Sequence, residues 1–288
     1  MPEPWIEQFV QILNSGRIIN NRMSDAIALK NDHLQGKVYK YRCVNDRSLQ
    51  NLQEDTIWLA SPDKYNDPFD CLFSVSDEDI LPILRQTLNE ELIRIYSPSA
   101  PELEPAHADR LLGEALEGIR KMRGATKICS FSAANNIILM WSHYANHHTG
   151  FCIEYDLEPL EPQHTMRKNL YPVIYDPNLY SLTPYMQDLC RTDRSAFAVN
   201  GLLFPVLYKY AGWSYEKEWR AIWFCDQICD DHAHAVPKAS RVYLGAKIDA
   251  PAARQVYDIC AARGIEVLKM KMELDRFRLE PEPYSAGR

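Results

Sequence analysis

The chain has 288 residues, a formal net charge of −7 and a pI near 5.7. Its 46% hydrophobic and 25% charged residues are typical of globular proteins, which excludes the disordered and fibrous classes. The acidic balance argues against broad binding of duplex nucleic acid, and no run approaches the ~20 apolar residues of a membrane helix. We therefore expect a globular protein that has no membrane partner.

The cysteines indicate the compartment. Eight of them are spread along the chain, and several lie in apolar runs such as Lys127–Cys129 and Phe151–Ile153. Reduced cysteine acts in such runs as a small hydrophobe, whereas scaffolds that depend on disulfides are much shorter chains. We expect a reducing, cytoplasmic environment.

The first half of the chain begins with a helical segment over residues 1–36, since Trp5, Phe9, Ile12 and Leu13 recur at helical spacing. A helical hairpin is expected at about 77–123, inserted between strands and joined by the proline-rich residues 97–106. The elements predicted here are helices at about 5–13, 47–54, 77–95 and 107–123, and strands at 37–43, 56–61 and 126–132.

The second half is mixed, with an irregular or helical stretch at about 179–210. Strands separated by uneven helical inserts favour an α+β fold over a regular doubly wound sheet. We therefore predict a single α+β domain over residues 37–288. The elements predicted here are helices at about 136–145 and 250–263, and strands at 150–155, 172–175, 218–225, 241–244 and 265–270.

The segment Trp213–Cys225 holds a pair of acids. Trp219 and alternate residues after it share one face of a predicted strand, which places Glu216, Glu218 and Arg220 on the other face. The two carboxylates would lie about 7 Å apart on an extended backbone. Such a pair can divide its work at a catalytic site, one acid holding a substrate hydroxyl while the other stabilises positive charge. The alternative is a solvated strand edge with an exposed ion pair.

The turn Asn66-Asp67 directly follows the strand TIWLAS and its last residue, Ser61. Asn and Asp are ordinary turn formers, so a purely structural Asx turn is one interpretation. Loop residues that a rigid strand holds in place also commonly line functional sites. Both interpretations stay open.

The segment 137–145 predicts an apolar helix, in which His143 should be at least partly buried. Such a histidine is either a core residue bonded to a backbone carbonyl or a site residue beside Tyr144. His143 and His147 have the spacing of helical metal ligands, but HYANH lacks the glutamate of the HExxH motif.

A second possible metal site is the tract of Cys225, Cys229, His232 and His234. Its residue types suit zinc, but its spacing is not that of a standard finger, and the tract could equally be a loop. No GxGxxG, GxxxxGK[ST] or GxSxG motif is present. Their absence argues against the simplest dinucleotide-binding folds, P-loop nucleotide-binding proteins and α/β-hydrolase esterases. We expect no metal requirement.

Several of these motifs together resemble a bacterial family known as domain of unknown function 2971 (DUF2971). That resemblance covers most of residues 38–245 and carries no established activity. The matching segments are Tyr39–Arg42, Ser61–Asp70, Ser130–Ser132, Met140–Ala145 with Gly150, and Trp213–Arg220.

A weaker resemblance is to ADP-ribosyltransferases of the Arg/Ser-x-Ser/Glu-x-Glu type, whose motifs follow the same chain order. It implies a mainly antiparallel, split β-sandwich fold and NAD as the substrate. It further implies that Arg42 contacts the phosphates or ribose, and that Ser130 or Ser132 shapes the nicotinamide pocket. Glu218 would stabilise the oxocarbenium-like centre and Glu216 would orient the acceptor. The middle motif departs from the family, being Ser-Phe-Ser where Ser-Thr-Ser is usual.

Three functions therefore follow as hypotheses. The first is an NAD-using transferase or glycohydrolase, as in a toxin or phage-defence effector, with Glu218, Glu216 and Arg42 as catalytic residues. The second is a metal-dependent hydrolase or nuclease with Asp67, Asp70, Glu216 and Glu218 as ligands. The third is a non-catalytic sensor lined by Trp58, Trp141, Trp213 and Trp219. Under the first, the residues expected to bind the nucleotide are Arg42, Ser61, Asn66, Asp67, Ser130, Ser132, Trp141, His143 and Tyr144.

Overall fold

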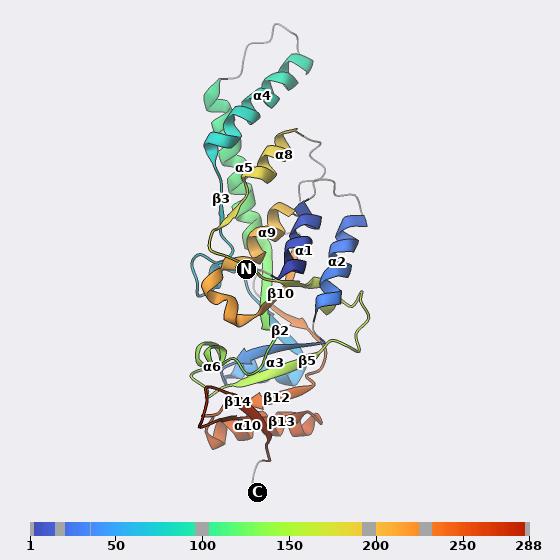
Figure 1. Cartoon of the computed structure of the whole chain (residues 1–288), viewed down its shortest axis with the longest axis vertical. Helices are drawn as coiled ribbons and strands as arrows, with labels where there is room; N and C mark the ends of the chain where they lie inside the picture. Colours follow the sequence, from blue (N-terminus) through green and yellow to red (C-terminus); the bar gives the residue numbers. More distant parts are fainter. Residues whose placement is uncertain are drawn as a thin grey trace.

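The computed structural model describes residues 3–14, 21–34, 36–95, 104–191, 200–224 and 232–285. The molecule is elongated, with a helical hairpin at one end of its long axis and the last helix and strands at the other (Figure 1). A large sheet extends from the base of the hairpin to the opposite end of the molecule, where the C-terminal strands form its edge.

The central sheet has eight strands in the order β14-β13-β12-β5-β1-β4-β10-β6. All neighbouring pairs in it are antiparallel except β12 and β13, which the crossover helix α10 (Ala250–Ala262) connects in parallel. Its strands are β1 (Lys37–Arg42), β4 (Thr126–Ser132), β5 (Phe151–Asp156), β6 (Leu170–Pro172), β10 (Glu218–Phe224), β12 (Arg241–Leu244), β13 (Glu266–Met272) and β14 (Leu279–Pro283).

The other described strands form three separate pairs, so the strands divide unevenly between sheets. The pairs are β2 (Thr56–Leu59) with β11 (His232–Ala235), β3 (Phe73–Ser74) with β8 (Tyr180–Ser181), and β7 (Ile174–Asp176) with β9 (Tyr208–Tyr210). The predicted strand at 172–175 is in fact two strands that separate at Val173 and join different sheets. The α+β class with mainly antiparallel sheets is confirmed.

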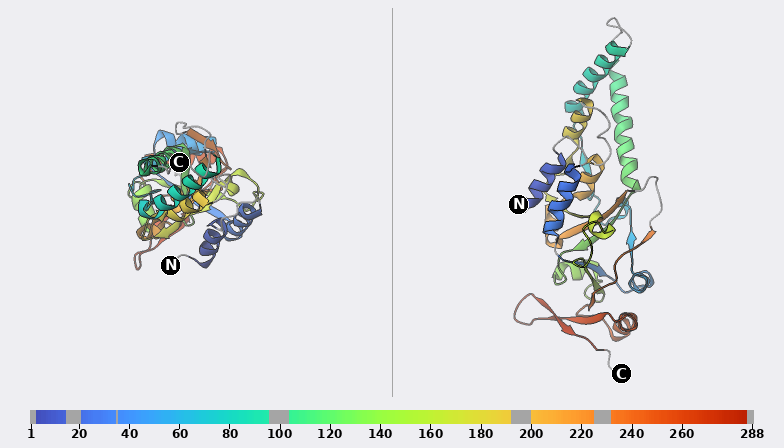
Figure 2. Two further views of the ribbon diagram at one scale, coloured as in Figure 1. Left: turned by 90° about the horizontal axis from the view of Figure 1, so that it is seen from above. Right: turned by 90° about the vertical axis from the view of Figure 1, so that its right-hand side faces the viewer.

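Two helices make up the N-terminal segment, α1 (Pro4–Asn14) and α2 (Asn21–His33), which lie side by side (Figure 2). Trp5 stacks between His33 of α2 and Trp219 of β10, with ring centroids 4.5 and 6.0 Å away. Phe9 is fully buried in the same region. These apolar contacts attach the segment to the sheet.

The predicted hairpin is formed by α4 (Asp77–Ile95) and α5 (Pro105–Ala125), which project together from the sheet (Figure 2). Helices α8 (Thr183–Arg191) and α9 (Asn200–Leu207) pack against its base. The proline-rich connection at 97–106 lies largely outside the described residues. A cluster of buried side chains that includes Ile80, Leu112, Phe204 and Ile222 joins this helical part to the sheet.

Four short helices complete the described elements that bear on the site: α3 (Asp46–Glu54), α6 (Ile138–Tyr144), α7 (Thr165–Asn169) and the 3₁₀ helix η3 (Ala211–Glu216). A further 3₁₀ turn, η1 (Pro62–Lys64), follows β2. Within the described residues, no helix has the length and apolar character needed to cross a membrane. Five cysteines with described side chains, Cys43, Cys71, Cys129, Cys152 and Cys260, are free thiols, and all of these except Cys43 are buried.

Candidate functional site

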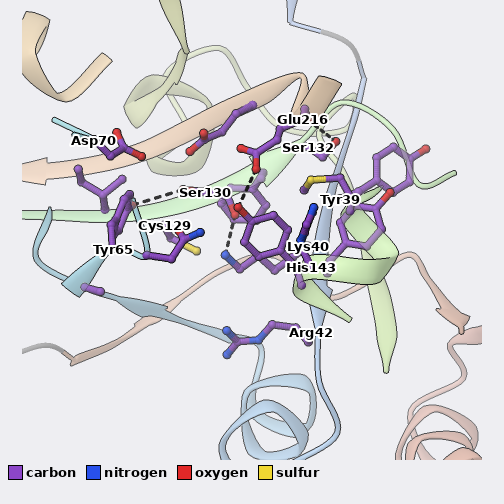
Figure 3. Close-up of a pocket in the computed structure, with 18 of the residues that line it drawn as sticks. Tyr39, Lys40, Arg42, Tyr65, Asp70, Cys129, Ser130, Ser132, His143 and Glu216 are labelled. Carbon is purple, nitrogen blue, oxygen red and sulfur yellow. Dashed lines mark hydrogen bonds between the residues drawn. The ribbon is translucent and has the colours of Figure 1, made fainter. Parts of the chain in front are cut away.

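A cavity of about 500 Å³ lies over the central strands β1 and β4 (Figure 3). Its volume falls within the ~300–1,000 Å³ common for ligand sites. Strands, helix α6, the turn after β2 and the segment from β9 to β10 all contribute to it. Its lining residues are Tyr39, Lys40, Tyr41, Arg42, Trp58, Ala60, Lys64, Tyr65, Asn66, Asp70, Ile128, Cys129, Ser130, Phe131, Ser132, Met140, His143, Tyr144, Lys209, Glu216 and Glu218.

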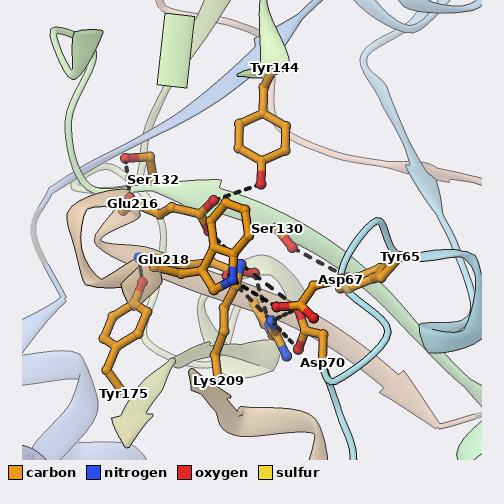
Figure 4. A network of polar contacts seen from close by, with 12 residues as sticks. Tyr65, Asp67, Asp70, Ser130, Ser132, Tyr144, Tyr175, Lys209, Glu216 and Glu218 are labelled. Atoms are coloured by element: carbon orange, nitrogen blue, oxygen red, sulfur yellow. Dashed lines mark hydrogen bonds and ion pairs between the residues drawn. The ribbon is translucent and has the colours of Figure 1, made fainter. Parts of the chain in front are cut away.

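Three carboxylates and two cations form a buried cluster along one wall (Figure 4). Lys209 Nζ donates to Glu216 Oε2 at 2.5 Å and to Glu218 Oε2 at 2.7 Å. Arg220 Nε donates to Glu218 Oε1 at 2.8 Å, and its Nη2 donates to both oxygens of Asp70 at 2.8 Å. Three carboxylates against two cations leave one negative charge in excess. We call these five residues the charge cluster.

The backbone brings Glu216 and Glu218 together in a way that strand alternation did not predict. Glu216 ends the 3₁₀ helix η3, and β10 begins only at Glu218. Lys217 between them adopts a left-handed conformation with φ of 48°. The predicted single strand face is therefore wrong for Glu216, although both carboxylates do meet, at Lys209 Nζ. The alternative, a solvated strand edge, is also wrong, because Glu216 and Glu218 are only 2% and 5% exposed.

The two glutamates differ in how easily they take up a proton. Burial raises the pKa of Glu216 above its ordinary value, and the neighbouring Lys209 only partly offsets this. Burial also acts on Glu218, but the cations of Arg220 and Lys209 outweigh it and hold the pKa of that carboxyl well below its ordinary value. Glu216 is therefore where the excess charge of the cluster can be neutralised.

Tyr144 extends from α6 to the charge cluster. Its hydroxyl donates to Glu216 Oε1 at 2.6 Å, so both carboxylate oxygens of Glu216 accept hydrogen bonds. Burial, followed by this contact with Glu216, raises the pKa of Tyr144 well above its ordinary value, which keeps the phenol protonated. The Ser132 hydroxyl donates to the backbone carbonyl of Glu216 at 2.7 Å and so fixes the residue from the other side.

Positive side chains occupy other parts of the cavity lining. Lys40 Nζ donates to the Ser130 carbonyl at 2.7 Å, and Arg42 Nη2 donates to Asn51 Oδ1 at 2.9 Å. Both acceptors are neutral oxygens, so neither hydrogen bond is an ion pair. Lys64 adds a third cation. Figure 3 shows Arg42 on the opposite side of the cavity from Glu216 and Asp70, so the cavity is polarised.

The packing of β5 against β1 holds Arg42 in place. Gly150 precedes β5, and a Cβ built on it would lie 2.1 Å from the Arg42 carbonyl oxygen. Any other residue would push the two backbones apart. The resemblance to DUF2971 included Gly150, and this close approach is the physical reason for a glycine there.

Most of the predicted binding residues meet at this cavity: Arg42, Asn66, Ser130, Ser132, His143, Tyr144, Glu216 and Glu218 all line it. His143 was expected to be partly buried, but it is exposed. Its ring lies about 6 Å from those of Tyr144, Trp213 and Tyr215, at the side of α6 that faces solvent.

Three predicted binding residues are absent from the cavity lining. Trp141 is fully buried and donates its indole N–H to the Asn135 carbonyl. Its ring packs edge-to-face against that of Tyr41, which does line the cavity. Ser61 is buried and accepts a hydrogen bond from Lys127. Asp67 accepts one from the Trp213 indole at 2.7 Å, which ties the turn after β2 to η3.

The candidate metal ligands do not form a site in the part of the chain that is described, where no group of three His, Cys, Asp or Glu side chains has a metal-binding arrangement. Cys225 and Cys229 of the predicted zinc tract lie outside the described residues. His232 and His234 belong to β11, which pairs with β2. Asp70, Glu216 and Glu218 already hold Lys209 and Arg220, which a metal ion would have to displace.

Sequence reasoning missed Lys209, the residue at the centre of the charge cluster. Its ammonium is hydrogen-bonded to two acids and lies 5.4 Å above the Trp213 ring. One signal was available, since a lone lysine within the apolar run LLFPVLYKYAGW must find a carboxylate if it is buried. Tyr65 and Lys40 were also missed as lining residues.

Comparisons with known proteins agree with one of the two predicted resemblances. Residues 140–221 match the family model described as "Protein of unknown function (DUF2971)". The searches of curated proteins and of solved structures found no match. The matched segment contains both MWSHYA and WSYEKEWR. The predicted resemblance to DUF2971 is therefore confirmed over the segment that supplies Tyr144, Lys209, Glu216 and Glu218 to the cavity.

Proposed function

We propose that the cavity binds an NAD-type dinucleotide and cleaves its bond to nicotinamide, as an ADP-ribosyltransferase-like or NAD glycohydrolase-like enzyme. One observation carries the proposal: the cation of Arg42 and a net-negative charge cluster lie on opposite sides of a single cavity. A dinucleotide needs both features, because its pyrophosphate is anionic and its reacting ribose becomes cationic as nicotinamide leaves.

Arg42 and Lys40 would hold the pyrophosphate. Both are charged, both line the cavity, and both donate to neutral oxygens that a phosphate could replace or join. Ser130 contributes a hydroxyl 3.3 Å from that of Tyr65, in the position expected to contact the nicotinamide end. An effector role, as a toxin or in phage defence, belongs to the same proposal and depends on NAD turnover.

The reaction would break the bond between the ribose C1′ and the pyridinium nitrogen. The bonding electrons go to nicotinamide, which leaves as a neutral molecule, while positive charge develops on the ribose. The excess negative charge of the cluster stabilises that cation electrostatically. Water or an acceptor group then forms the new bond to C1′ and gives up a proton.

Glu216 is better suited than Glu218 to receive that proton. The pKa of Glu216 is raised above its ordinary value and is therefore closer to neutral pH, and a general base is most effective when its pKa lies near the working pH. Glu218 is held ionised between Arg220 and Lys209, so in this proposal it anchors Lys209 and does not touch the substrate. These roles reverse the assignment that the transferase resemblance implied.

The test is to incubate the purified protein with NAD, with and without a chelator, and to measure released nicotinamide. We expect release that the chelator leaves unchanged and that Glu216→Gln reduces by about 100-fold or more, the usual effect of losing a general base. The glutamine keeps the size and one acceptor of the side chain, so the variant should fold.

No release under any condition, together with a melting temperature that NAD does not change, would refute the proposal. Release that the chelator abolishes would instead support a metal-dependent hydrolase. Ligand binding that Glu216→Gln leaves intact, without turnover, would support the non-catalytic sensor.

A further inference from the structure

A second cavity, of about 400 Å³, lies on the other side of β9. It shares only Lys209 with the first cavity, so β9 is the wall between them. It lies outside the chemistry proposed above, and its lining is mostly apolar and aromatic. The lining residues are Phe69, Leu72, Asp176, Pro177, Asn178, Leu179, Tyr208, Lys209 and Tyr210.

Strand alternation explains how β9 serves both cavities. Lys209 is buried and directs its ammonium to the charge cluster, while its neighbours Tyr208 and Tyr210 point the opposite way. Tyr210 is 58% exposed, and its ring lies over Gly212, where a Cβ would meet it at 2.6 Å. The glycine therefore makes room for this ring position.

Phe69 lines the same cavity from the turn that follows β2. Its backbone N–H donates to Asp67 Oδ1 at 2.9 Å, and Asp67 Oδ2 accepts from the Trp213 indole. This Asx turn holds Phe69 outward, 65% exposed, although the side chain is large and apolar. Exposed aromatic side chains gathered around a cavity are typical of binding sites.

The charges around the second cavity favour a cation. Asp176 lines it, and only its Oδ1 accepts the Asn178 N–H, at 2.8 Å. Asp176 of β7 pairs with Tyr210 of β9 in the register of these two strands, so this carboxylate lies beside the aromatic residues of β9. The charge cluster behind β9 adds a further net negative charge. Lys209 does not oppose this, because its ammonium is already bound to two carboxylates.

We propose that this second cavity binds a guanidinium group, as carried by an arginine side chain. Aromatic faces attract cations, and a planar guanidinium can stack on Phe69 or Tyr210 while it donates to Asp176. An alkylammonium is more strongly hydrated and loses more on entering a largely apolar cavity.

Binding is tested without NAD, by titrating N-acetyl-arginine methylamide into the protein and following chemical shifts. The neutral isostere N-acetyl-citrulline methylamide is the matched probe. We expect the arginine probe to bind about tenfold more tightly, which corresponds to about 1.4 kcal/mol, since the carboxylate and the aromatic faces attract only the charged probe.

Phe69→Ala and Tyr210→Ala should each weaken binding of the arginine probe about three- to tenfold, and Asp176→Asn by a similar factor. Phe277→Ala is the matched control, because Phe277 is likewise an exposed phenylalanine but does not line this cavity. All the aromatic positions are at least half exposed, so the variants should fold, and melting temperatures check this.

Equal binding of the two probes, or equal loss of binding in Phe69→Ala and Phe277→Ala, would overturn the proposal. The outcome is independent of NAD turnover: arginine binding without nicotinamide release would refute only the proposed reaction. Nicotinamide release without arginine binding would refute only this second site.

Discussion

Each member of the charge cluster depends on the others, because a buried charge needs partners. Arg220 is completely buried and binds both Asp70 and Glu218, while Lys209 binds Glu216 and Glu218. Removing one partner leaves an opposite charge without compensation in a medium where solvation is poor. The cluster is therefore a structural unit as well as a candidate site.

The two glutamates should respond differently to the same substitution. Glu218→Gln removes the charge that holds Lys209 and Arg220 together and should lower the free energy of unfolding by about 3–5 kcal/mol. Glu216→Gln removes the excess negative charge and should change stability by less than about 1 kcal/mol. Urea denaturation of both variants measures the difference. Equal losses would show that the excess charge does not reside on Glu216.

The pH dependence of stability should also report on the protonation of the Glu216 carboxyl. Its folded pKa is raised above the ordinary value of 4.5, so the folded state favours the protonated carboxyl. The associated stabilisation is complete below 4.5 and is lost as pH rises through the raised pKa. Relative to Glu216→Gln, the wild-type protein should therefore become steadily less stable as pH increases above about 4.5.

Denaturation at a series of pH values measures that relative stability, and a difference that stays flat would contradict the assignment. Glu218 behaves in the opposite sense. Its lowered pKa gives stability that is present above its unfolded value and lost as pH falls. Comparing Glu216→Gln with the wild type at each pH cancels this second contribution.

At the level of elements, the site depends on how closely β1, β5 and α6 approach one another. The chain between α6 and β5 makes a tight turn in which Asn146, His147 and His148 have positive φ. The Gly150 N–H then donates to the Ala145 carbonyl, and Gly150 packs against the Arg42 carbonyl. This turn connects the element that holds Tyr144 to the strand beside Arg42.

Gly150→Ala should accordingly be destabilising. The added methyl group would lie 2.1 Å from a backbone oxygen that cannot move without breaking the pairing of β1 and β5, so we expect a loss of about 2–4 kcal/mol. Gly118→Ala is the control. It lies within α5, where nothing beyond its chain neighbours and the adjoining helix backbone lies within 4 Å of the new methyl group, so the substitution should stabilise the protein by about 0.5–1 kcal/mol. Thermal denaturation of the two variants measures both changes in stability. Equal changes in Gly150→Ala and Gly118→Ala would argue against a steric clash at Gly150.

Sequence patterns predicted elements well wherever periodicity was strong. The strands at 126–132 and 241–244 have the predicted bounds, and the hairpin helices differ from prediction by a few residues at most. The patterns failed where backbone geometry changes within two or three residues. Lys217 has a left-handed φ, which ends η3 and starts β10, and no residue preference at lysine signals it.

At the level of the whole molecule, long-range pairing creates the candidate site. Strand β1 pairs with β4 and β5, while β10 pairs with β4, so residues near 42, 130, 144 and 218 become neighbours. The motifs at Arg42, Ser130 and Glu218 were recognised from the sequence, and they do line one cavity. That they meet is a consequence of strand order, which local patterns do not encode.

The sequence by itself determined the α+β class, most of the helices and strands, and the resemblance to DUF2971, because these follow from local periodicity and from short motifs. Only the tertiary structure decided which candidates are accessible. It buried Trp141, exposed His143 and placed the unnoticed Lys209 between two glutamates. The physical reason is that burial and charge pairing depend on distant segments of the chain, whose contacts form only when the sheet assembles.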